Sequence, residues 1–305
     1  MKIVFSIFIY FIFFTNLALA LENKILIKVN NEIITTVDLL NEIKYLNSIN
    51  KNFKDFKKEE IYIISKKSLI REKIKEIELL NYFKEIKIKD ELFNNLINDH
   101  IKRLKFSSLA EFKNHLKNND VKFEVIKKKI TVEILWNRLI FNKFSKNVKI
   151  DREQIKTELN NSNIKKELLL SEILFTVENN ENLVDKYKLI VKNINEKNFD
   201  KAASIHSISD TSKNGGKLGW IPMSALNQKI KKELLNINIG DFTKPIVIPG
   251  GFLIIKINDA RKIKDKIDIK KEVESVAERK TNEQLNQFSA IYFNKIKKNI
   301  KISEL

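Results

Sequence analysis

Side chains that can do chemistry are sparse in this chain of 305 residues, which contains three His and no Cys. His100 and His115 lie in segments predicted to be helical, and neither has an acidic partner at metal-binding spacing. No Ser-His-Asp arrangement and no nucleotide-binding glycine loop is visible either. The sequence therefore predicts neither a metal site nor a cofactor.

One polar loop is a candidate because it lies directly before a glycine turn. Ser209 and Asp210 precede the segment Asn214–Trp220, which reads Asn-Gly-Gly-Lys-Leu-Gly-Trp. The hydroxyl and the carboxylate supply polarity for a binding site, although Ser and Asp in such loops commonly bond only the local backbone. For His206, which comes just before the loop, a structural role is favoured over catalysis.

Glycine and proline mark the region that must position this loop. All six Gly and all three Pro lie between Gly215 and Gly251. Gly215 and Gly216, followed by Leu-Gly-Trp, require tight turns around a buried strand. Pro249-Gly250-Gly251 forms a second turn, which opens into the apolar run Phe-Leu-Ile-Ile.

From about residue 165 onward, the pattern predicts strands mixed with helices, an α+β layout. The predicted elements are a strand at 168–177, helices at 182–195, 199–205 and 225–235, and a hairpin that pairs 243–248 with 252–257.

The preceding region is predicted to be mainly helical, because no Gly or Pro occurs between residues 21 and 214. It begins with two short strands joined by an Asn-Asn turn. Thr35 and Asp38 then form a capping-box pattern at the start of a helix. Apolar residues at helical spacing continue from 58 to 144.

The C-terminal segment is predicted to be one long helix that completes the helical domain. Leu285, Phe288, Tyr292 and Ile296 step by three and four residues, which places them on one face. A single helix cannot bury such a face alone, so we expect it to pack on the N-terminal helices. The expected domains are a helical domain at 21–164, an α/β domain at 165–260 and the C-terminal helix within 261–305.

The first 20 residues have the layout of a secretory signal peptide. Lys2 precedes an apolar run from 3 to 14 that only Ser6 interrupts, and Ala18-Leu19-Ala20 offers a cleavage site. The run is shorter than the roughly 20 residues of a membrane-spanning helix, and retention as an uncleaved anchor is the alternative. An exported chain without Cys has no disulfides, so packing must stabilise it.

The net charge of +18 does not by itself indicate a nucleic-acid partner. Lys, Ile and Asn are over-used along the entire chain, including predicted core positions, which is typical of a compositional bias. Gly/Arg-rich tracts and aromatic-basic interleaving are missing. We therefore expect no nucleic-acid binding, while the charge is suited to acidic polypeptides or anionic lipid.

The glycine segments and the domain order resemble a known family. Asn214–Trp220 followed by Pro249–Lys256 is similar to parvulin domains, small folds that isomerise X-Pro bonds. A helical domain completed by a C-terminal helix, with parvulin domains inserted, resembles the periplasmic chaperone SurA and its relatives. The opening Val29–Thr35 resembles the start of that family after its signal peptide. This chain differs in having one parvulin domain rather than two.

The resemblance implies an apolar pocket for the proline ring. By the family pattern, Leu218, Leu226 and Ile230 line this pocket, and Ile230 stands where a Phe is usual. Trp220 and Leu253 are the further substrate contacts that the resemblance implies.

The polar part of the implied site departs from the family pattern at two positions. Glu172 takes the place of a His on the first strand, and Leu253 takes the place of a His on the last strand. Ser209, with Asp210 next to it, stands where Cys or Asp is common. The implied catalytic residues are therefore Glu172, Ser209 and Asp210, without the imidazoles that usually line this site.

The function implied is that of an exported, ATP-independent chaperone of the periplasm. Its partners would be unfolded outer-membrane or secreted proteins, held in a groove between the two domains. An active peptidyl-prolyl cis-trans isomerase is the alternative, since amide isomerisation needs an apolar pocket and a few polar groups but no metal or covalent step. In a third interpretation, the parvulin domain docks peptides for a partner machinery.

Overall fold

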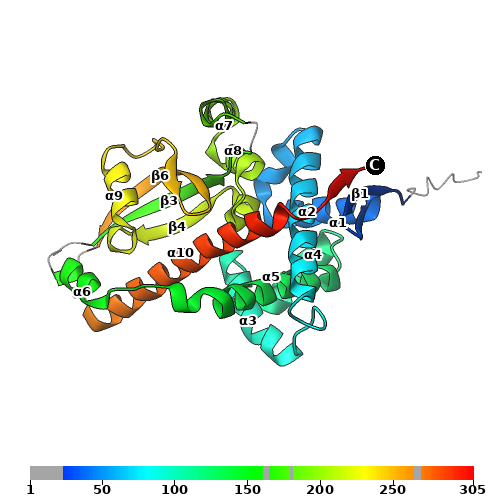
Figure 1. Cartoon of the computed structure of the whole chain (residues 1–305), viewed down its shortest axis with the longest axis horizontal. Coiled ribbons are helices and arrows are strands. Elements are labelled where there is room, and N and C mark those ends of the chain that lie inside the picture. The colour runs from blue at the N-terminus through cyan, green and yellow to red at the C-terminus, as the bar shows by residue number, and fades with distance from the viewer. Residues whose placement is uncertain (1–22, 161–164, 179–180, 264–268) are drawn as a thin grey trace, which may run out of the picture.

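The computed structural model describes residues 23–160, 165–178, 181–263 and 269–305 (Figure 1). The predicted signal peptide at 1–20 lies outside the described residues. Within the described ranges, no helix is long and apolar enough to cross a membrane. Helices dominate and two small antiparallel sheets accompany them, which confirms the α+β class.

The N-terminal part is a helical module, and its first helix begins where the capping box predicted. The Thr35 amide donates to the Asp38 carboxylate (2.8 Å), and the Asp38 amide donates to Thr35 Oγ1 (3.3 Å). The elements are β1 (Ile25–Val29), β2 (Glu32–Thr35), α1 (Thr36–Ile49), η1 (Lys51–Asp55), α2 (Lys58–Leu80), α3 (Asp90–Arg103), α4 (Leu109–Asn118), α5 (Phe123–Phe144), η2 (Ser145–Asn147) and α6 (Arg152–Asn160).

The C-terminal helix α10 (Ile269–Lys297) packs on this module, as its apolar face predicted. Trp136 Nε1 of α5 donates to Ser289 Oγ at 2.8 Å, and the rings of Phe144 and Phe288 stack with centroids 5.2 Å apart. Phe293 is buried in one core cluster with residues of β1, α2 and α5. Burial of a side chain of this size contributes about 1.5–3 kcal/mol, so α10 adds substantially to the stability of the module.

The C-terminus also adds a strand that the sequence pattern did not predict. β7 (Ile302–Glu304) pairs antiparallel with β1, which gives a sheet in the order β2-β1-β7. Asn30, with φ 51°, turns the β1–β2 hairpin, and its side chain accepts a hydrogen bond from the Lys301 amide (2.8 Å). Three residues are too few to show alternation, and the partner strand lies at the other end of the chain.

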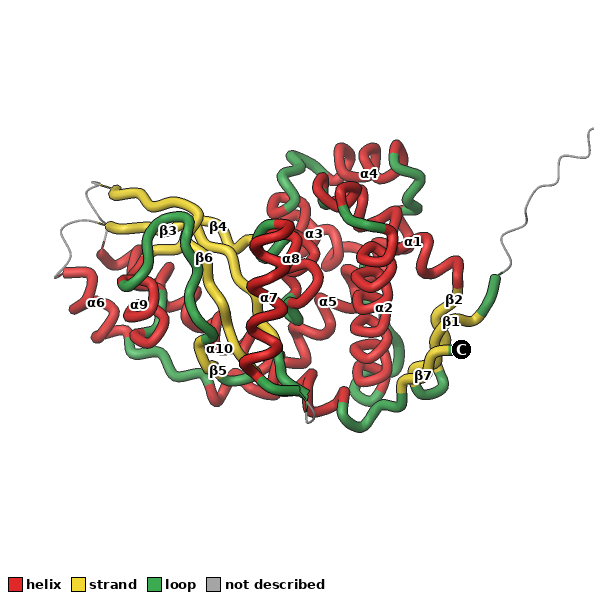
Figure 2. The backbone as a smooth tube through the Cα atoms, turned by 90° about the horizontal axis from the view of Figure 1, so that it is seen from above, coloured by secondary structure: helices red, strands yellow, loops and turns green. Residues whose placement is uncertain are grey.

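A second sheet of four antiparallel strands has the order β4-β3-β6-β5. The side chains of β3 (Lys165–Phe175) point alternately to the two faces of the sheet. Leu168 and Leu170 pack toward α9 (Gln228–Leu235), whereas Ile173 and Phe175 pack toward α7 (Leu183–Lys197) and α8 (Phe199–His206). Figure 2 shows α8 between this sheet and α2. The elements are β3 (Lys165–Phe175), α7 (Leu183–Lys197), α8 (Phe199–His206), η3 (Asp210–Asn214), β4 (Lys217–Pro222), η4 (Met223–Ala225), α9 (Gln228–Leu235), β5 (Ile246–Ile248) and β6 (Gly251–Ile263).

Several predicted boundaries in this unit were wrong: β3 covers 165–175 rather than 168–177, β5 begins at Ile246 rather than 243, and two further elements differ for clear reasons. The helix expected from residue 225 begins at Gln228, because Asn227 Oδ1 accepts from the Ile230 amide at 2.9 Å and acts as the N-cap. The strand expected to end at 257 extends to Ile263, since β6 pairs with β3 along the whole length of β3. A local N-cap that the prediction overlooked starts the helix, whereas a partner strand elsewhere in the chain decides where β6 ends.

Candidate functional site

Glu172 lies on β3, on the face of the sheet that carries α9. Leu170 and Leu174 flank it at the strand period of two and pack in the apolar cluster of that face. Cross-strand pairing places Ile255 of β6 opposite Glu172, and Leu253 opposite Leu174. Glu172 is thus a single carboxylate in an otherwise apolar row of side chains.

Two hydroxyl groups of the loop that contains η3 bind the Glu172 carboxylate. Ser209 Oγ donates to Glu172 Oε1 at 2.7 Å, and Thr211 Oγ1 donates to the same oxygen at 2.9 Å. Burial raises the pKa of Glu172, the two hydroxyl hydrogen bonds act in the opposite direction, and the charge of Asp210 raises the pKa further. We call Ser209 and Thr211 the hydroxyl clamp of Glu172.

The clamp combines a predicted pair of residues with one that sequence reasoning missed. The structure brings Glu172 and Ser209 together, as a shared site requires. Thr211 was missed, although its position two residues after Ser209, with a second hydroxyl, is a signal in the sequence.

The carboxylate of Asp210 is paired with cations of the helical module. Arg71 Nε lies 3.3 Å from Asp210 Oδ1, and Lys75 Nζ lies 3.6 Å from the same oxygen. Burial alone would raise the pKa of Asp210, but the charges of Lys75, Arg71 and Lys213 outweigh burial and hold this pKa well below its usual range. A carboxylate held ionised in this way is a weak proton acceptor. Neither Arg71 nor Lys75 was a candidate in the sequence.

Three predicted pocket residues pack together on the Glu172 face of the sheet. Leu226, Ile230 and Leu253 are 8%, 4% and 5% exposed and belong to one apolar cluster with residues of β3 and β6. The apolar and polar parts of the predicted site therefore share one face. Because the three side chains are buried, they also form part of the core of the unit.

The other two predicted contact residues, Leu218 and Trp220, both lie on β4, but neither joins this apolar cluster. Leu218 is the extra residue of a β-bulge opposite β3 and is 36% exposed. Trp220 pairs with Leu169, which faces away from the row that contains Glu172, and the guanidinium carbon of Arg261 lies 4.2 Å from the Trp220 ring centroid. The structure does not bring Trp220 to Glu172.

Gly216 is the glycine that the site requires, because its backbone approaches β3 closely. Its φ is +77°, its carbonyl accepts a hydrogen bond from the Glu172 amide (2.8 Å), and a Cβ on it would lie 2.2 Å from the Glu172 carbonyl oxygen. Any side chain at this position would push the turn away from β3. The loop that carries the hydroxyl clamp would move with it.

Helix α10 passes close to the site and contributes a carboxylate. Asn227 Nδ2 donates to Glu283 Oε1 at 3.1 Å, and Asn294 Nδ2 donates to the carbonyl of Gly250 at 3.2 Å. Burial raises the pKa of Glu283, the Asn227 hydrogen bond lowers it, and the charge of Glu172 raises it further. The surroundings of Glu172 are therefore built by the α/β unit and the helical module together.

His206 has structural partners. Asn193 Nδ2 lies 2.8 Å from His206 Nε2, which accepts its hydrogen bond. Burial, together with the charges of Lys67, Lys186 and Lys197, lowers the pKa of His206 to about 4. The ring is therefore neutral near pH 7.

His115 also has structural partners. The His115 ring donates through Nε2 to the Ser48 carbonyl (2.7 Å) and packs against Phe106. His100 lies in α3, and its side chain lies outside the described set. Over the described ranges, no group of three or more His, Asp or Glu side chains is arranged to hold a metal ion.

Polar contacts fill the boundary where a groove between the two units was expected. Lys67 Nζ of α2 donates to the Ile205 carbonyl (2.9 Å), and Asn50 Nδ2 donates to the Lys213 carbonyl (3.3 Å). The hollow along this boundary measures only about 10 Å³. This hollow, which lies at one place along the boundary, is too small for an extended polypeptide.

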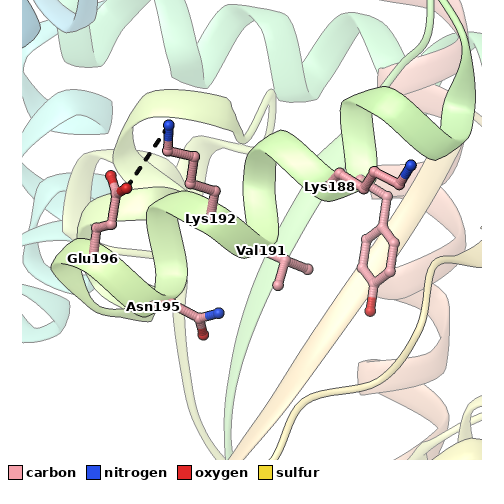
Figure 3. A pocket seen from close by; sticks show the side chains of 6 residues that line it. Lys188, Val191, Lys192, Asn195 and Glu196 are labelled. Atoms are coloured by element: carbon pink, nitrogen blue, oxygen red, sulfur yellow. Dashed lines mark ion pairs between the residues drawn. The ribbon is translucent and has the colours of Figure 1, made fainter.

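A larger hollow of about 480 Å³ lies on α7, away from Glu172 (Figure 3). All of its lining residues belong to this one helix, so no second element supplies groups across it, whereas ligand sites bring polar groups from several elements together. The lining residues are Tyr187, Lys188, Val191, Lys192, Asn195 and Glu196.

Comparisons with known proteins agree with this architecture. Residues 168–259 match the family described as Rotamase, PPIC-type PPIASE domain. The chain is 22% identical over 238 residues to the chaperone SurA of Pseudomonas fluorescens, across 72% of this chain and 55% of that protein. It is 25% identical over 187 residues to the chaperone SurA of Pseudomonas putida, across 58% of this chain and 44% of that protein. The chain thus spans about half the length of these curated relatives.

Solved structures add only weak similarity. A structure of the SurA-like chaperones PEB4 and Cj1289 of Campylobacter jejuni is 18% identical, with a TM-score of 0.36 over 93% of this chain and 99% of that chain. A crystal structure of a PpiC-type isomerase domain is 28% identical, with a TM-score of 0.28 over 32% of this chain and 93% of that chain. The assignment rests on the sequence matches: the chain is SurA-like, and residues 168–259 form one PPIC-type rotamase domain.

Proposed function

We propose that this protein is an exported chaperone that binds unfolded polypeptides without ATP. Its similarity to SurA chaperones over 72% of the chain supports this function and is the observation that carries it. The signal-peptide pattern at 1–20 supports export to the periplasm. The clients that we expect there are unfolded outer-membrane or secreted proteins.

A group of aromatic rings on the helical module, two of them exposed and three half-buried, supports polypeptide binding. Tyr82 and Phe141 are 50% and 53% exposed. Phe144 contacts two more rings of the group, at centroid distances of 5.2 and 5.8 Å. Phe141 lies one helical turn before Phe144 on α5, and exposed aromatic side chains that gather in this way mark interaction sites. The aromatic surface comprises Tyr82, Phe141, Phe144, Phe288 and Tyr292.

One cation adds to the chemistry of this surface. Lys143 Nζ donates to Tyr82 Oη at 2.6 Å and lies 5.0 Å from the ring centroid of Tyr292. Tyr rings pack against apolar side chains, and the Tyr hydroxyl and Lys ammonium groups donate hydrogen bonds to backbone carbonyls. This combination suits extended segments of varied sequence. Many weak contacts of this kind would allow clients to exchange rapidly.

Peptidyl-prolyl isomerisation is the second candidate function, which the PPIC-type match over residues 168–259 favours. Catalysis needs polar groups that bind the twisted amide more tightly than the planar one. Here the hydroxyls of Ser209 and Thr211 donate to Glu172, and Asp210 is paired with Arg71. We therefore expect weak isomerase activity at most, and a rotamase domain that serves mainly as a binding platform.

Two assays on the same protein test this division of roles. Suppression of aggregation of a urea-unfolded outer-membrane protein measures chaperone activity, and isomerisation of a proline tetrapeptide measures catalysis. The variant Tyr82→Ser/Phe141→Ser should lose most of the suppression. Leu235→Ser/Val247→Ser, which changes side chains of similar exposure on the rotamase domain, is the matched control. Equal suppression by both variants would count against the aromatic surface.

Restoration of the family pattern tests the isomerase question separately. Glu172→His combined with Leu253→His should create or increase isomerisation if the loss of the imidazoles limits catalysis. Strong isomerisation by the unchanged chain would instead mean that Glu172, Ser209 and Asp210 form a working site.

A further inference from the structure

The rotamase domain meets α2 along a polar seam, formed by α2 on one side and by residues from Ile205 to Lys213 on the other. Lys67, Arg71 and Lys75 occupy one face of α2 at steps of four residues. Lys67 Nζ donates to the Ile205 carbonyl at 2.9 Å, and Arg71 donates to the Ile208 carbonyl. Arg71 and Lys75 both lie beside the Asp210 carboxylate. The apolar core clusters on the two sides of this seam are separate, apart from a partly buried Ile205.

The loop 209–214 faces two partners at once. Ser209 and Thr211 bind Glu172 within the rotamase domain. Asp210, between them in sequence, pairs with Arg71 across the seam, and Lys213 Nζ lies 3.8 Å from Glu133 Oε1 of α5. One short loop therefore contacts the site through Ser209 and Thr211 and the helical module through Asp210 and Lys213.

The cations on α2 are held by the helical module itself. Lys75 is fully buried, its Nζ lies 2.6 Å from Glu133 Oε2, and it lies over the Trp136 ring at 5.4 Å. Arg71 lies over the Phe293 ring, with its guanidinium carbon 4.9 Å from the centroid. These contacts do not involve the loop 209–214. The helical module therefore holds Arg71 and Lys75 in place, and these two cations in turn position the Asp210 carboxylate.

We infer that Arg71 and Lys75 are positioning residues of the rotamase site. Acting through Asp210, they order the loop 209–214 and so hold Ser209 and Thr211 on Glu172. The inference rests on the function proposed above, because it describes how the same peptide-binding site is controlled. When the domain is docked on α2 the site is organised, and when the polar seam opens the hydroxyl clamp loosens.

Hydrogen exchange of the full chain tests this without any substrate. The amides of Thr211, Gly215 and Gly216 are hydrogen bonded inside the loop, so their exchange reports its order. Arg71→Gln and Asp210→Asn should each speed this exchange by about two- to fivefold, the effect of losing one partly exposed ion pair on a local opening. The effect of the double variant should be smaller than the sum of the two single effects, because both changes remove the same pair, while Arg71 also loses the Ile208 carbonyl and Asp210 also loses Lys75.

Two matched variants separate positioning from general destabilisation. Arg71→Lys keeps a cation near Asp210 and should retain slow exchange. Lys73→Gln lies on the same helix but removes ion pairs to Glu32 and Glu76, so it should leave the loop unchanged. Asp210→Asn is the safeguard if Arg71→Gln fails to fold. The Asp210 side chain is 52% exposed, so its substitution disturbs the core less.

Unchanged loop exchange in both Arg71→Gln and Asp210→Asn would overturn the inference, as would an equal rise in Lys73→Gln. Proline-peptide binding, measured on the same samples, should weaken in Arg71→Gln and Asp210→Asn and recover in Arg71→Lys. If the unchanged chain binds no proline peptide while loop exchange responds as expected, the function proposed for the site fails and the ordering of the loop by α2 stands.

Discussion

The two seams that join the rotamase domain to the rest of the chain have opposite chemistry. The polar seam at α2 consists of ion pairs and hydrogen bonds to carbonyl groups. At the other end of α10 lies an apolar seam, where α6, η4 and α10 share one buried cluster (Figure 1). The apolar seam comprises Ile155, Leu159, Ala225, Val273, Val276 and Ala277.

This difference indicates which contact is permanent and which can open. Apolar burial stabilises by roughly 25 cal/mol per Å² and depends little on salt or pH. Partly exposed ion pairs contribute about 0–1 kcal/mol each and weaken in salt. We therefore expect the apolar seam to act as the hinge and the polar seam to act as the part that releases. The hydroxyl clamp lies on the side that releases.

The largest effect is expected at the apolar seam. Ile155 is 3% exposed, and Ile155→Ala should lower the free energy of unfolding by about 2–5 kcal/mol, through lost burial and the cavity left behind. Urea unfolding followed by circular dichroism measures this change. Ile239→Ala, at a residue that is 57% exposed, is the control and should stay within about 0.5 kcal/mol. An unchanged midpoint for Ile155→Ala would remove the assigned hinge.

A smaller effect is expected at the polar seam. Lys75→Met should cost about 1–3 kcal/mol, because Glu133 and Asp210 each lose a cation but keep another one nearby. The same unfolding experiment applies, with Lys192→Met as the exposed control on α7. If Lys75→Met proves more destabilising than Ile155→Ala, the assignment of hinge and releasable contact must be reversed.

The effect that is smallest near neutral pH is a pH dependence at the edge of the polar seam. The pKa of His206 is lowered to about 4, so between this value and its ordinary 6.5 the unfolded chain binds a proton that the folded chain does not. The contribution is fully present above about pH 6.5 and is lost as pH falls toward about 4. The loss is roughly 1 kcal/mol near pH 6 and about 3 kcal/mol near pH 4.

Unfolding curves of the unchanged chain and of His206→Asn between these pH values isolate this contribution. The variant should show a flatter pH dependence. NMR titration of the imidazole protons provides a direct check, and an ordinary His pKa there would contradict the buried, neutral ring.

Much of the fold could be predicted because the deciding interactions are local. The capping box of Thr35 and Asp38 starts α1 where predicted, and the face of α10 that carries Phe288 and Tyr292 packs on the helical module. Gly216 makes the close approach to β3 that its place in a double-glycine turn indicated. Each of these signals lies within a few residues, where helix period, caps and backbone freedom act.

The candidate site was only partly predictable. The structure brings Glu172 together with Ser209, but Trp220 lies on the other face of the sheet. The β-bulge at Leu218 lies in the same strand and cannot be seen in the alternation of six residues. Site placement depends on strand register, which cross-strand partners decide.

The sequence by itself determined most of the helices, the strands β1, β2, β3, β5 and β6, and the glycine turns, because these follow from patterns along the chain. Only the tertiary structure decided that Asp210 pairs with Arg71 rather than serving Glu172, that β7 joins β1, and that one seam is polar and the other apolar. Charges spread over 57 basic and 39 acidic residues offer many equivalent pairings. Packing selects among them, since an ion pair forms only where the core has already placed its two groups.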